Sequence, residues 1–223
     1  MTIDSHKYPL PKRLRHHTSP SIYLPANELF RIPDYYPPLI EKIDWKDYFS
    51  NGFPPNSIDV GCGKAKLLLD FAELHPKKNV LGIEIRKPLV AWANNVIKSE
   101  NIANAMVIWY SIANGFPFIE NNSISDVFYL FPDPWPKTKH AKRRVLNISF
   151  LNEIERILKD DGKLYIATDL EEIHQYHFEI LTDFKKFKFD LANEKKWHLP
   201  ITNKETFCLE KSIEVYKIIA SKK

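Results

Sequence analysis

The chain has 223 residues, of which 44% are hydrophobic and 27% are charged, and its formal net charge is +4 at pH 7. This is the composition of an ordinary globular protein, and the length suits one sizeable domain with a full core. The sequence has no apolar run of 18 residues and no apolar stretch behind its N-terminal charges, which predicts neither a membrane span nor a secretory signal.

The two cysteines, Cys62 and Cys208, lie far apart in the sequence. They form neither a disulfide framework nor the spacing of a metal site. Such usage is typical of a protein of the reducing cytosol. We therefore expect a cytoplasmic protein without a bound metal and without a membrane partner.

Residues 1–25 are expected to form a basic N-terminal arm. They contain four prolines, with Lys12, Arg13, Arg15, His16 and His17 between them. Two interpretations stay open, namely a flexible or surface-wrapped tail and an arm that lies along RNA. We expect residues 26–223 to form a single domain, in which residues 26–56 are a lead-in segment rich in Pro, Tyr and Trp.

From residue 57 on, apolar strands alternate with amphipathic helices. The predicted strands are 57–61, 79–85, 105–109, 125–131, 164–168 and 214–220. The predicted helices are 64–74, 88–98, 147–158 and 169–181. This alternation is typical of an α/β fold with a doubly wound, mostly parallel sheet.

A glycine loop, Gly61-Cys62-Gly63, follows the first strand and precedes the first helix. Glycines at this place let a ligand approach the backbone N–H groups at a helix N-terminus. Asp59 stands before the loop, and Glu84 lies near the end of the next strand. An acid at the position of Glu84 is suited to accept hydrogen bonds from the two hydroxyls of an adenosine ribose.

The glycine pattern also distinguishes between nucleotide cofactors. The dinucleotide fingerprint requires a third glycine at position 66, where this chain has Lys66, and a P-loop motif is absent from the sequence. An adenosine ligand without a pyrophosphate therefore fits better than NAD or a nucleoside triphosphate. S-adenosylmethionine is such a ligand, and its cationic sulfonium favours nearby acids.

The segment Phe131–Arg144 carries the strongest functional signal and reads F-P-D-P-W-P-K-T-K-H-A-K-R-R. Pro132 and Pro134 stiffen the turn and deliver Asp133 to the carboxyl end of a strand, where ligands bind in open α/β sheets. Trp135, with its planar aromatic ring, follows the two prolines in the sequence, and a run of cationic residues comes after it. A Pro-Asp-Pro turn or a basic cluster alone would be ordinary surface structure. Together they predict chemistry on a nucleic acid.

These motifs resemble those of the bacterial tRNA (guanine-N7-)-methyltransferases over about residues 27–220. The matching segments are Asp59–Lys64, Gly82–Glu84, Phe131–Lys137, Lys139–Arg144 and Ala167–Asp169. The resemblance implies a class I methyltransferase fold of the Rossmann-like type with a seven-stranded sheet. It implies S-adenosylmethionine as cofactor, tRNA as partner, and methyl transfer to N7 of guanosine 46 in the variable loop. We expect a monomer or a weak homodimer.

The resemblance also implies roles for individual residues. Asp133 is the expected catalytic residue, and it is expected to line the cofactor together with Asp59, Gly61, Gly63 and Glu84. The adenine side aligns with Ser111, with Asn114 nearby, and the choice between these two stays open. The expected substrate-binding residues are Lys137, Asp169, Thr202 and Glu205, to which the basic loop adds Lys139, Lys142, Arg143 and Arg144.

The chain departs from the family at several of these positions. The family usually has Glu at the position of Asp59, a third glycine at the position of Ala65, and an acid or amide at the position of Ser111. Ser111 and Ala65 leave open a non-catalytic RNA-binding protein on the same scaffold. A methyltransferase for amino groups of DNA or protein also stays open, because the turn at Asp133 is similar to the acid-Pro-x-aromatic turn of such enzymes.

The expected reaction makes few demands on the side chains. Guanine N7 has an exposed lone pair and no proton, so a base is not needed to create the nucleophile. The work is alignment of N7, methyl group and sulfur, collinear and about 3 Å apart. We interpret Asp133 as a positioning and electrostatic group, which binds the exocyclic amine of guanine or the amino acid part of the cofactor.

Overall fold

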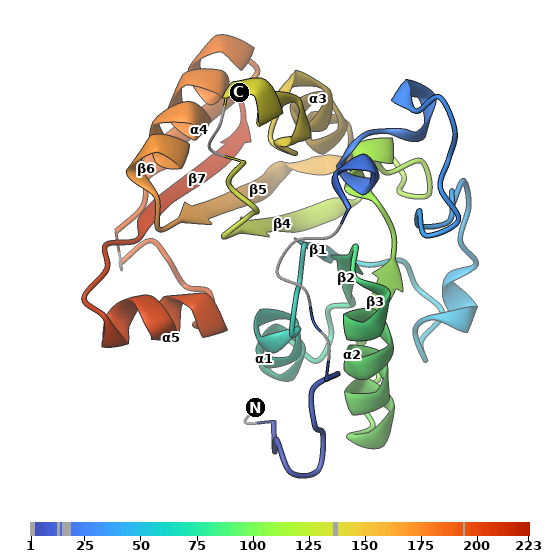
Figure 1. The fold of residues 1–223 in the computed structure, drawn as a ribbon. Helices are drawn as coiled ribbons and strands as arrows, with labels where there is room; N and C mark the ends of the chain where they lie inside the picture. The colour runs from blue at the N-terminus through green and yellow to red at the C-terminus, as the bar shows by residue number, and fades with distance from the viewer. Residues whose placement is uncertain (1–2, 13, 15–18, 136–137, 194) are drawn as a thin grey trace.

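The computed structural model describes residues 3–12, 14, 19–135, 138–193 and 195–223. Within these residues, seven strands form a single sheet, with helices packed on both of its faces (Figure 1). The strands are β1 Ser57–Val60, β2 Val80–Glu84, β3 Ala105–Trp109, β4 Ile124–Leu130, β5 Leu158–Thr168, β6 Phe187–Leu191 and β7 Tyr216–Lys222. The helices are α1 Lys66–Leu74, α2 Lys87–Ser99, α3 Ile148–Ile157, α4 Glu171–Phe184 and α5 Asn203–Glu210.

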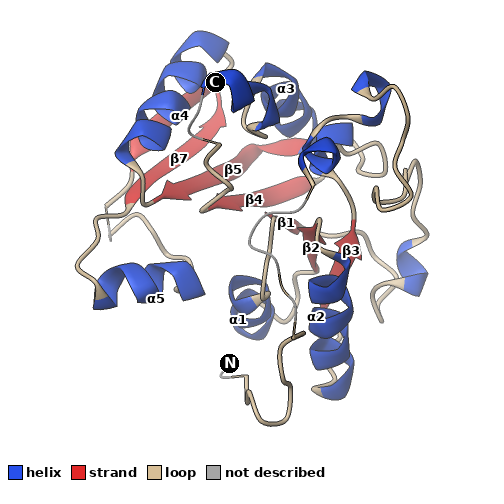
Figure 2. Ribbon diagram, in the orientation of Figure 1, coloured by secondary structure: helices blue, strands red, loops and turns tan. Residues whose placement is uncertain are grey.

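The strand order is β3-β2-β1-β4-β5-β7-β6; β1 to β5 pair in parallel, and β7 pairs antiparallel with both β5 and β6. The predicted doubly wound, mostly parallel seven-stranded sheet is therefore confirmed (Figure 2). The order reverses between β1 and β4, because the chain proceeds from β1 outward to β3 and then returns to β4. The carboxyl ends of strands at such a reversal form the usual ligand crevice of an open α/β sheet.

Two hydrophobic clusters, one on each face of the sheet, hold the layers together. One contains the buried faces of α1 and α2 with Tyr8 from the N-terminal segment. The other contains the buried faces of α3 and α4 with Ile43 and Phe49 from the lead-in segment. Because helices cover both faces, all residues of β1 and β2 are buried. The polar residues of these strands, Ser57, Asp59 and Glu84, are therefore buried together with the apolar ones.

Three elements differ from the predictions. β5 begins at Leu158, and its pairing with β4 shifts from Ile124–Leu158 to Asp126–Lys163. The observed strand is therefore longer than the predicted strand 164–168 and contains an irregularity near its start. β6 and α5 were not predicted, because β6 is a short edge strand and α5 buries only Glu205 and Cys208. Such an element carries little of the apolar periodicity from which helices and strands are predicted.

The described residues of the N-terminal segment pack against the domain. Lys7 forms an ion pair with Glu100 at 2.7 Å, and the indole N–H of Trp92 donates to the Tyr8 carbonyl at 3.2 Å. Ile22 is also buried. Whether residues 1–25 form an arm separate from the domain stays a prediction.

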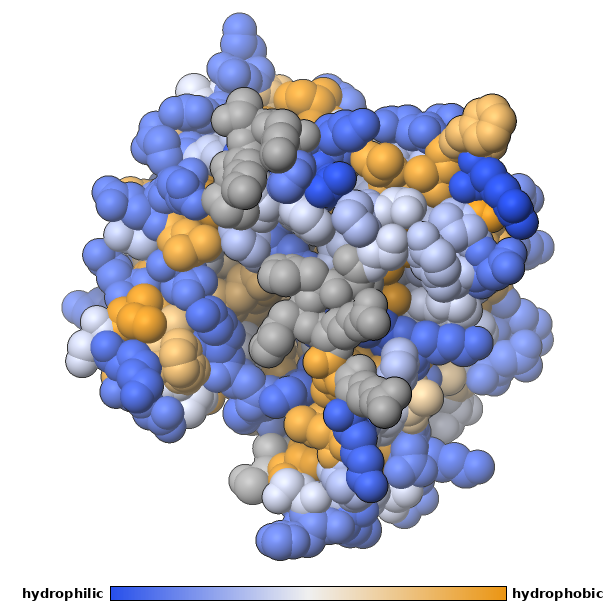
Figure 3. Space-filling view, viewed as in Figure 1, coloured by the Kyte–Doolittle hydropathy of each residue, from blue (hydrophilic) through white to orange (hydrophobic). Residues whose placement is uncertain are grey.

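The surface agrees with the ordinary composition. Within the described ranges, none of the helices is long and apolar enough to cross a membrane. Figure 3 shows hydrophilic side chains over most of one face of the molecule, with apolar side chains in small patches between them. Several large exposed apolar side chains, including Phe30 and Phe53, belong to the lead-in segment.

Candidate active site

The loops that follow β1, β2, β3 and β4 converge on one cavity at the reversal of strand order. Its lining brings together five of the predicted site residues, namely Gly61, Glu84, Ser111, Asp133 and Arg143. A second hollow adjoins it and is lined by Asp59, Gly61, Gly63 and Thr202. Gly61 lines both spaces, so a ligand can extend from one to the other past the glycine loop.

The glycine loop has the open backbone that close approach of a ligand requires. Gly61 has a φ of +77°, and a Cβ at this position would meet nothing within 4 Å. Gly63 and Ala65 also have positive φ values, of +56° and 55°. An L-residue in this conformation costs about 1–2 kcal/mol, which explains why the resembled family has glycine at the position of Ala65. Ala65 nevertheless keeps the loop in that shape.

Glu84 is 2% exposed and is held by a complete set of donors. Its Oε1 accepts from the backbone N and the Nε of Arg86 at 2.8 and 2.9 Å. Its Oε2 accepts from the Gly63 N at 2.9 Å and from Arg86 Nη2 at 3.0 Å. A carboxylate offers about four lone-pair sites. Ribose hydroxyls can therefore bind Glu84 only if Arg86 releases one of its hydrogen bonds to that carboxylate.

Asp59 lies buried beside this cluster. Burial, and then the negative charge of Glu84, raise the pKa of Asp59 to about 7. At neutral pH the carboxyl group is thus close to half ionised. A cationic ligand group in the adjoining hollow would favour its charged form.

Ser111 contacts the chain's own N-terminal segment, and Asn114 contacts the lead-in segment that follows it. The Ser111 hydroxyl donates to the Ile22 carbonyl at 2.7 Å. Asn114 Oδ1 accepts from the Ala26 N at 2.9 Å, and its Nδ2 donates to the Tyr36 hydroxyl at 2.8 Å. Ser111 lines the cavity, whereas Asn114 lines a groove outside it. This difference favours Ser111 for the adenine side.

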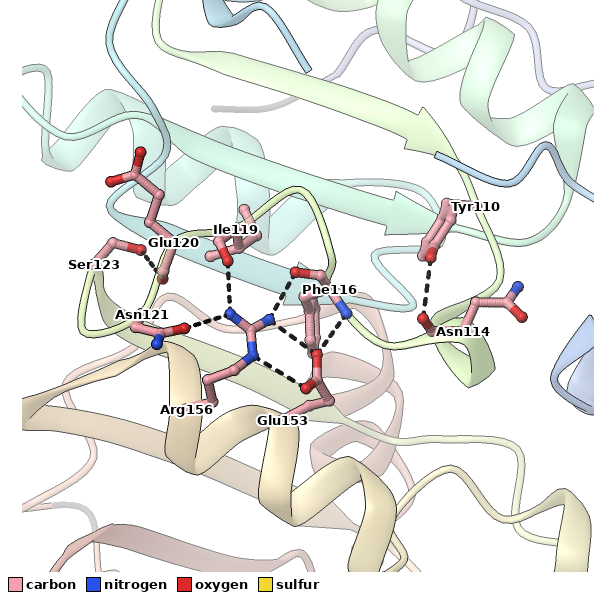
Figure 4. A network of polar contacts seen from close by, with 9 residues as sticks. All are labelled: Tyr110, Asn114, Phe116, Ile119, Glu120, Asn121, Ser123, Glu153 and Arg156. Carbon is pink, nitrogen blue, oxygen red and sulfur yellow. Dashed lines mark hydrogen bonds and ion pairs between the residues drawn. The ribbon is translucent and has the colours of Figure 1, made fainter. Parts of the chain in front are cut away.

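A polar network on α3 fixes the loop that carries these two residues (Figure 4). Glu153 accepts from the Phe116 N at 2.9 Å, and Arg156 Nη2 donates to the Phe116 carbonyl at 2.8 Å. Glu153 and Arg156 also pair with each other at 2.9 Å. The hydrogen bond from Arg156 and, after the opposing effect of burial, the one from the Phe116 N hold the pKa of Glu153 below its usual range. The β3–β4 loop is thereby anchored to a helix rather than left to solvent.

Asp133 lies on a strained turn at the carboxyl end of β4. Phe131 and Trp135, on either side of Pro-Asp-Pro, have positive φ values of 51° and 41°. The Phe131 N donates to the Ala167 carbonyl at 2.8 Å, which ties the turn to β5. Strain of this kind persists only where surrounding contacts enforce it, and it clusters at functional sites. One such contact comes from Tyr23, whose hydroxyl donates to Asp133 Oδ2.

The basic loop is partly occupied by contacts within the chain. The Arg143 guanidinium lies over the Trp135 ring at 4.9 Å. Arg144 donates to the Trp135 carbonyl and lies over the Tyr176 ring at 4.5 Å. Lys142 is exposed. Lys137 and the side chain of Lys139 lie outside the described part of the chain.

The remaining predicted substrate residues meet at the start of α5. Thr202 and Glu205 form a capping box, with bonds of 3.0 and 2.9 Å between side chain and backbone. Glu205 also pairs with Lys217 at 3.0 Å, and Asp169 pairs with Lys204 at 2.6 Å. The T-x-x-E segment thus has a structural role as a helix cap. Its contact with RNA stays a prediction.

Two residues of the site were missed by the sequence analysis. Arg86 stands two positions after Glu84, and an adjacent cation was a signal that could have been used. Tyr23 lies 110 positions before Asp133 in the chain. Its position in a segment flanked by prolines was the only signal in the sequence that could have pointed to it.

Comparisons with known proteins identify similar sequences over most of the chain. A family model described as "Putative methyltransferase" matches residues 54–218. A tRNA (guanine-N(7)-)-methyltransferase from Brevibacillus brevis is 33% identical over 156 residues, which cover 70% of this chain and 71% of that protein. One from Lactobacillus gasseri is 31% identical over 174 residues, covering 78% and 77%.

Solved structures share the fold at low identity. A SAM dependent methyltransferase from Aquifex aeolicus has a TM-score of 0.52 and 17% identity, and the match covers 92% of this chain and 98% of that one. Precorrin-6y C5,15-methyltransferase from Geobacter metallireducens has a TM-score of 0.53 and 15% identity, with 75% and 78% covered. The predicted class I methyltransferase fold is therefore confirmed.

Proposed function

This chain belongs to the tRNA (guanine-N(7)-)-methyltransferase family, and from that premise we propose that it methylates N7 of guanosine 46 in the variable loop of tRNA. It is an S-adenosylmethionine-dependent enzyme that acts on guanine N7 in tRNA. The observation that carries the proposal is the single cavity shared by Gly61, Glu84 and Asp133. The cofactor motif and the Pro-Asp-Pro turn, which are far apart in the sequence, line one space.

The residues of this space fit the cofactor. S-adenosylmethionine supplies a methyl group on a cationic sulfur. The adenosine fits between Glu84 and Ser111, where Gly61 leaves room for close approach. The amino acid part fits the adjoining hollow, where the buried Asp59 meets a cationic group.

The chain's own residues then have one main task, which is alignment. N7 carries no proton, so Asp133 need not act as a base. Its carboxylate accepts a hydrogen bond from the guanine exocyclic amine or from the cofactor's ammonium group, and so fixes one reactant against the other. The Trp135 ring, with Arg143 over it, provides a flat wall at the cavity. Such a wall suits a planar base.

The RNA backbone meets the basic loop in this proposal. Lys137, Lys139, Lys142 and Arg143 supply positive charge for phosphates, as Lys and Arg side chains generally do. Asp169 and the start of α5 lie at the same edge of the sheet. A cytoplasmic location, the absence of a metal and a monomeric or weakly dimeric state belong to the proposal as well.

The test is a nucleoside analysis. Purified protein and S-adenosylmethionine are incubated with unmodified tRNA, and the digested nucleosides are identified by mass spectrometry. We expect 7-methylguanosine, mapped to position 46, and none from a transcript with adenosine at that position. Methylation of another base or position would contradict the proposal. Calorimetric cofactor binding without any product would favour the non-catalytic scaffold.

A further inference from the structure

A segment of the N-terminal region, Pro20–Ala26, lies across the carboxyl edge of the sheet at the cavity. Its residues Ile22 and Tyr23 contact the two sides of the site. The Ile22 carbonyl accepts from the Ser111 hydroxyl, on the proposed adenine side. The Tyr23 hydroxyl donates to Asp133 Oδ2, on the proposed guanine side. The segment Pro20–Ala26 therefore contacts both the proposed adenine side and the proposed guanine side of the cavity.

The Tyr23 side chain is fixed by more than this hydrogen bond. Its ring meets the Trp135 ring edge-on, with centroids 5.0 Å apart, and it lines the same cavity as Asp133. Edge-to-face contact of two rings fixes their mutual orientation. The phenol is thus presented to the carboxylate at a set angle.

The backbone on either side of Tyr23 is held as well. Before it, Ile22 is buried. After it, the Leu24 carbonyl accepts from the Tyr36 hydroxyl at 2.9 Å, and the Ala26 N donates to Asn114 at 2.9 Å. Asn114 belongs to the β3–β4 loop, which α3 holds in place, and it also donates to the Tyr36 hydroxyl at 2.8 Å. The backbone around Tyr23 is therefore fixed by contacts with the rest of the protein.

A hydrogen bond from a fixed phenol has a definite effect on a carboxylate. The terminal torsion of Asp is broad, so an unsupported carboxylate samples many orientations. A charge-assisted O–H···O⁻ bond is about twice as strong as a neutral one, and it fixes the plane of the accepting group. Because misplacement of about 1 Å can cost about a hundredfold in rate, this orientation matters for a reaction that depends on alignment.

We propose that Tyr23 is a positioning residue for methyl transfer. Its phenol orients Asp133 toward the target guanine, and the Ile22–Ser111 bond couples that orientation to the cofactor side of the cavity. This inference rests on the proposed function. It assigns to the N-terminal segment a part in the chemistry itself, in addition to any contact with the RNA backbone.

The experiment compares Tyr23→Phe, which keeps the ring and removes only the hydroxyl, with the parent enzyme on tRNA. We expect kcat to fall about tenfold or more, while KM for tRNA and the cofactor affinity stay within about twofold. Tyr35→Phe is the matched control. Its hydroxyl bonds Ser19 and Ser21 of the same region, but the side chain is 54% exposed and lies outside the cavity lining. This control should keep the parent kcat.

A double-mutant cycle separates positioning from a structural effect. If Tyr23 acts through Asp133, Tyr23→Phe should cause no further loss of kcat in the Asp133→Ala background. Additive losses would overturn the inference, as would an unchanged or raised kcat in Tyr23→Phe alone. A raised kcat would mean that the phenol competes with the guanine. A parent enzyme that leaves tRNA guanine unmethylated would instead refute the proposed function.

Discussion

The two sides of the cavity are built in different ways. On the glycine-loop side, Glu84 is held by Arg86, two positions away, and by the Gly63 N, 21 positions away. On the Asp133 side, the carboxylate is held by Tyr23, which lies 110 positions away. The first side is a local motif that can be recognised from spacing. The second is assembled only when the N-terminal segment docks, so its geometry depends on the whole fold.

Asp133→Ala should produce the largest effect and tests the Asp133 side of the cavity. Loss of one oriented contact at the reacting centre should lower kcat about a hundredfold or more. RNA binding should persist, because the basic loop remains. Steady-state kinetics on tRNA measure the effect, and circular dichroism checks the fold. Asp160→Ala, at a carboxylate whose side chain is 98% exposed, is the control that should match the parent. Near-parent turnover of Asp133→Ala would remove the residue from the mechanism.

Glu84→Ala tests the local side. It removes the acceptors for the ribose hydroxyls and should weaken binding of S-adenosylmethionine and S-adenosylhomocysteine equally, by about ten- to a hundredfold. Calorimetry with both ligands measures the loss. Arg86→Ala leaves these acceptors in place and should cost less. If the Glu84 variant bound both ligands like the parent, the cavity would hold the ribose elsewhere.

The third prediction uses pH to probe the same side. With a pKa of about 7 in the cofactor-free protein, the Asp59 carboxyl is largely ionised at pH 8 and largely protonated at pH 6. Its raised pKa means that, without ligand, this carboxyl group holds its proton to a higher pH than an exposed aspartate does. If the cofactor requires the carboxylate, affinity should fall about tenfold from pH 8 to pH 6.

Asp59→Asn provides the reference for this measurement. The variant cannot titrate at that position, so the difference between the two pH profiles isolates Asp59 from the titration of the cofactor's own amino group. Parallel profiles would show that Asp59 does not face a cationic group of the cofactor.

The smallest expected effect is that of a substitution in the basic loop, which follows Asp133 in the sequence. Lys142→Ala should lower the slope of log affinity for tRNA against log salt by just under about one unit, because one phosphate contact is lost. Cofactor affinity should not change. Arg144→Ala, by contrast, removes a donor to the Trp135 carbonyl and should reduce thermal stability. A Lys142 variant with the parent salt slope would show that this lysine is only a solvated side chain.

The sequence predicted the local elements well, for physical reasons. β2 is buried on both faces and has no polar side chain before Glu84 at its end, and α1 to α4 each bury an apolar stripe. α5 buries no such stripe, and its first turn depends on the capping box of Thr202 and Glu205. Gly61 and Glu84 could be assigned from spacing, because a strand, a loop and a helix fix their separation.

The contacts of Ser111 and Asp133 could not be predicted in this way. Ser111 bonds to a residue 89 positions away, and Asp133 bonds to one 110 positions away. Local periodicity in the sequence does not indicate such long-range contacts. Likewise, the positive φ values of Phe131 and Trp135 cannot be inferred from residue type, since neither is a glycine. Tertiary contacts impose them.

The place of β7 in the sheet has a consequence for how the protein is made. β6 forms the edge of the sheet and pairs with β7, which lies between β6 and β5 although it is the last strand of the chain. The edge of β5 that faces β7 therefore stays unpaired until residues 216–222 have been synthesised. An unpaired strand edge is a template for association with other chains. A truncated polypeptide that stops before Tyr216 would therefore expose this edge of β5 to other chains.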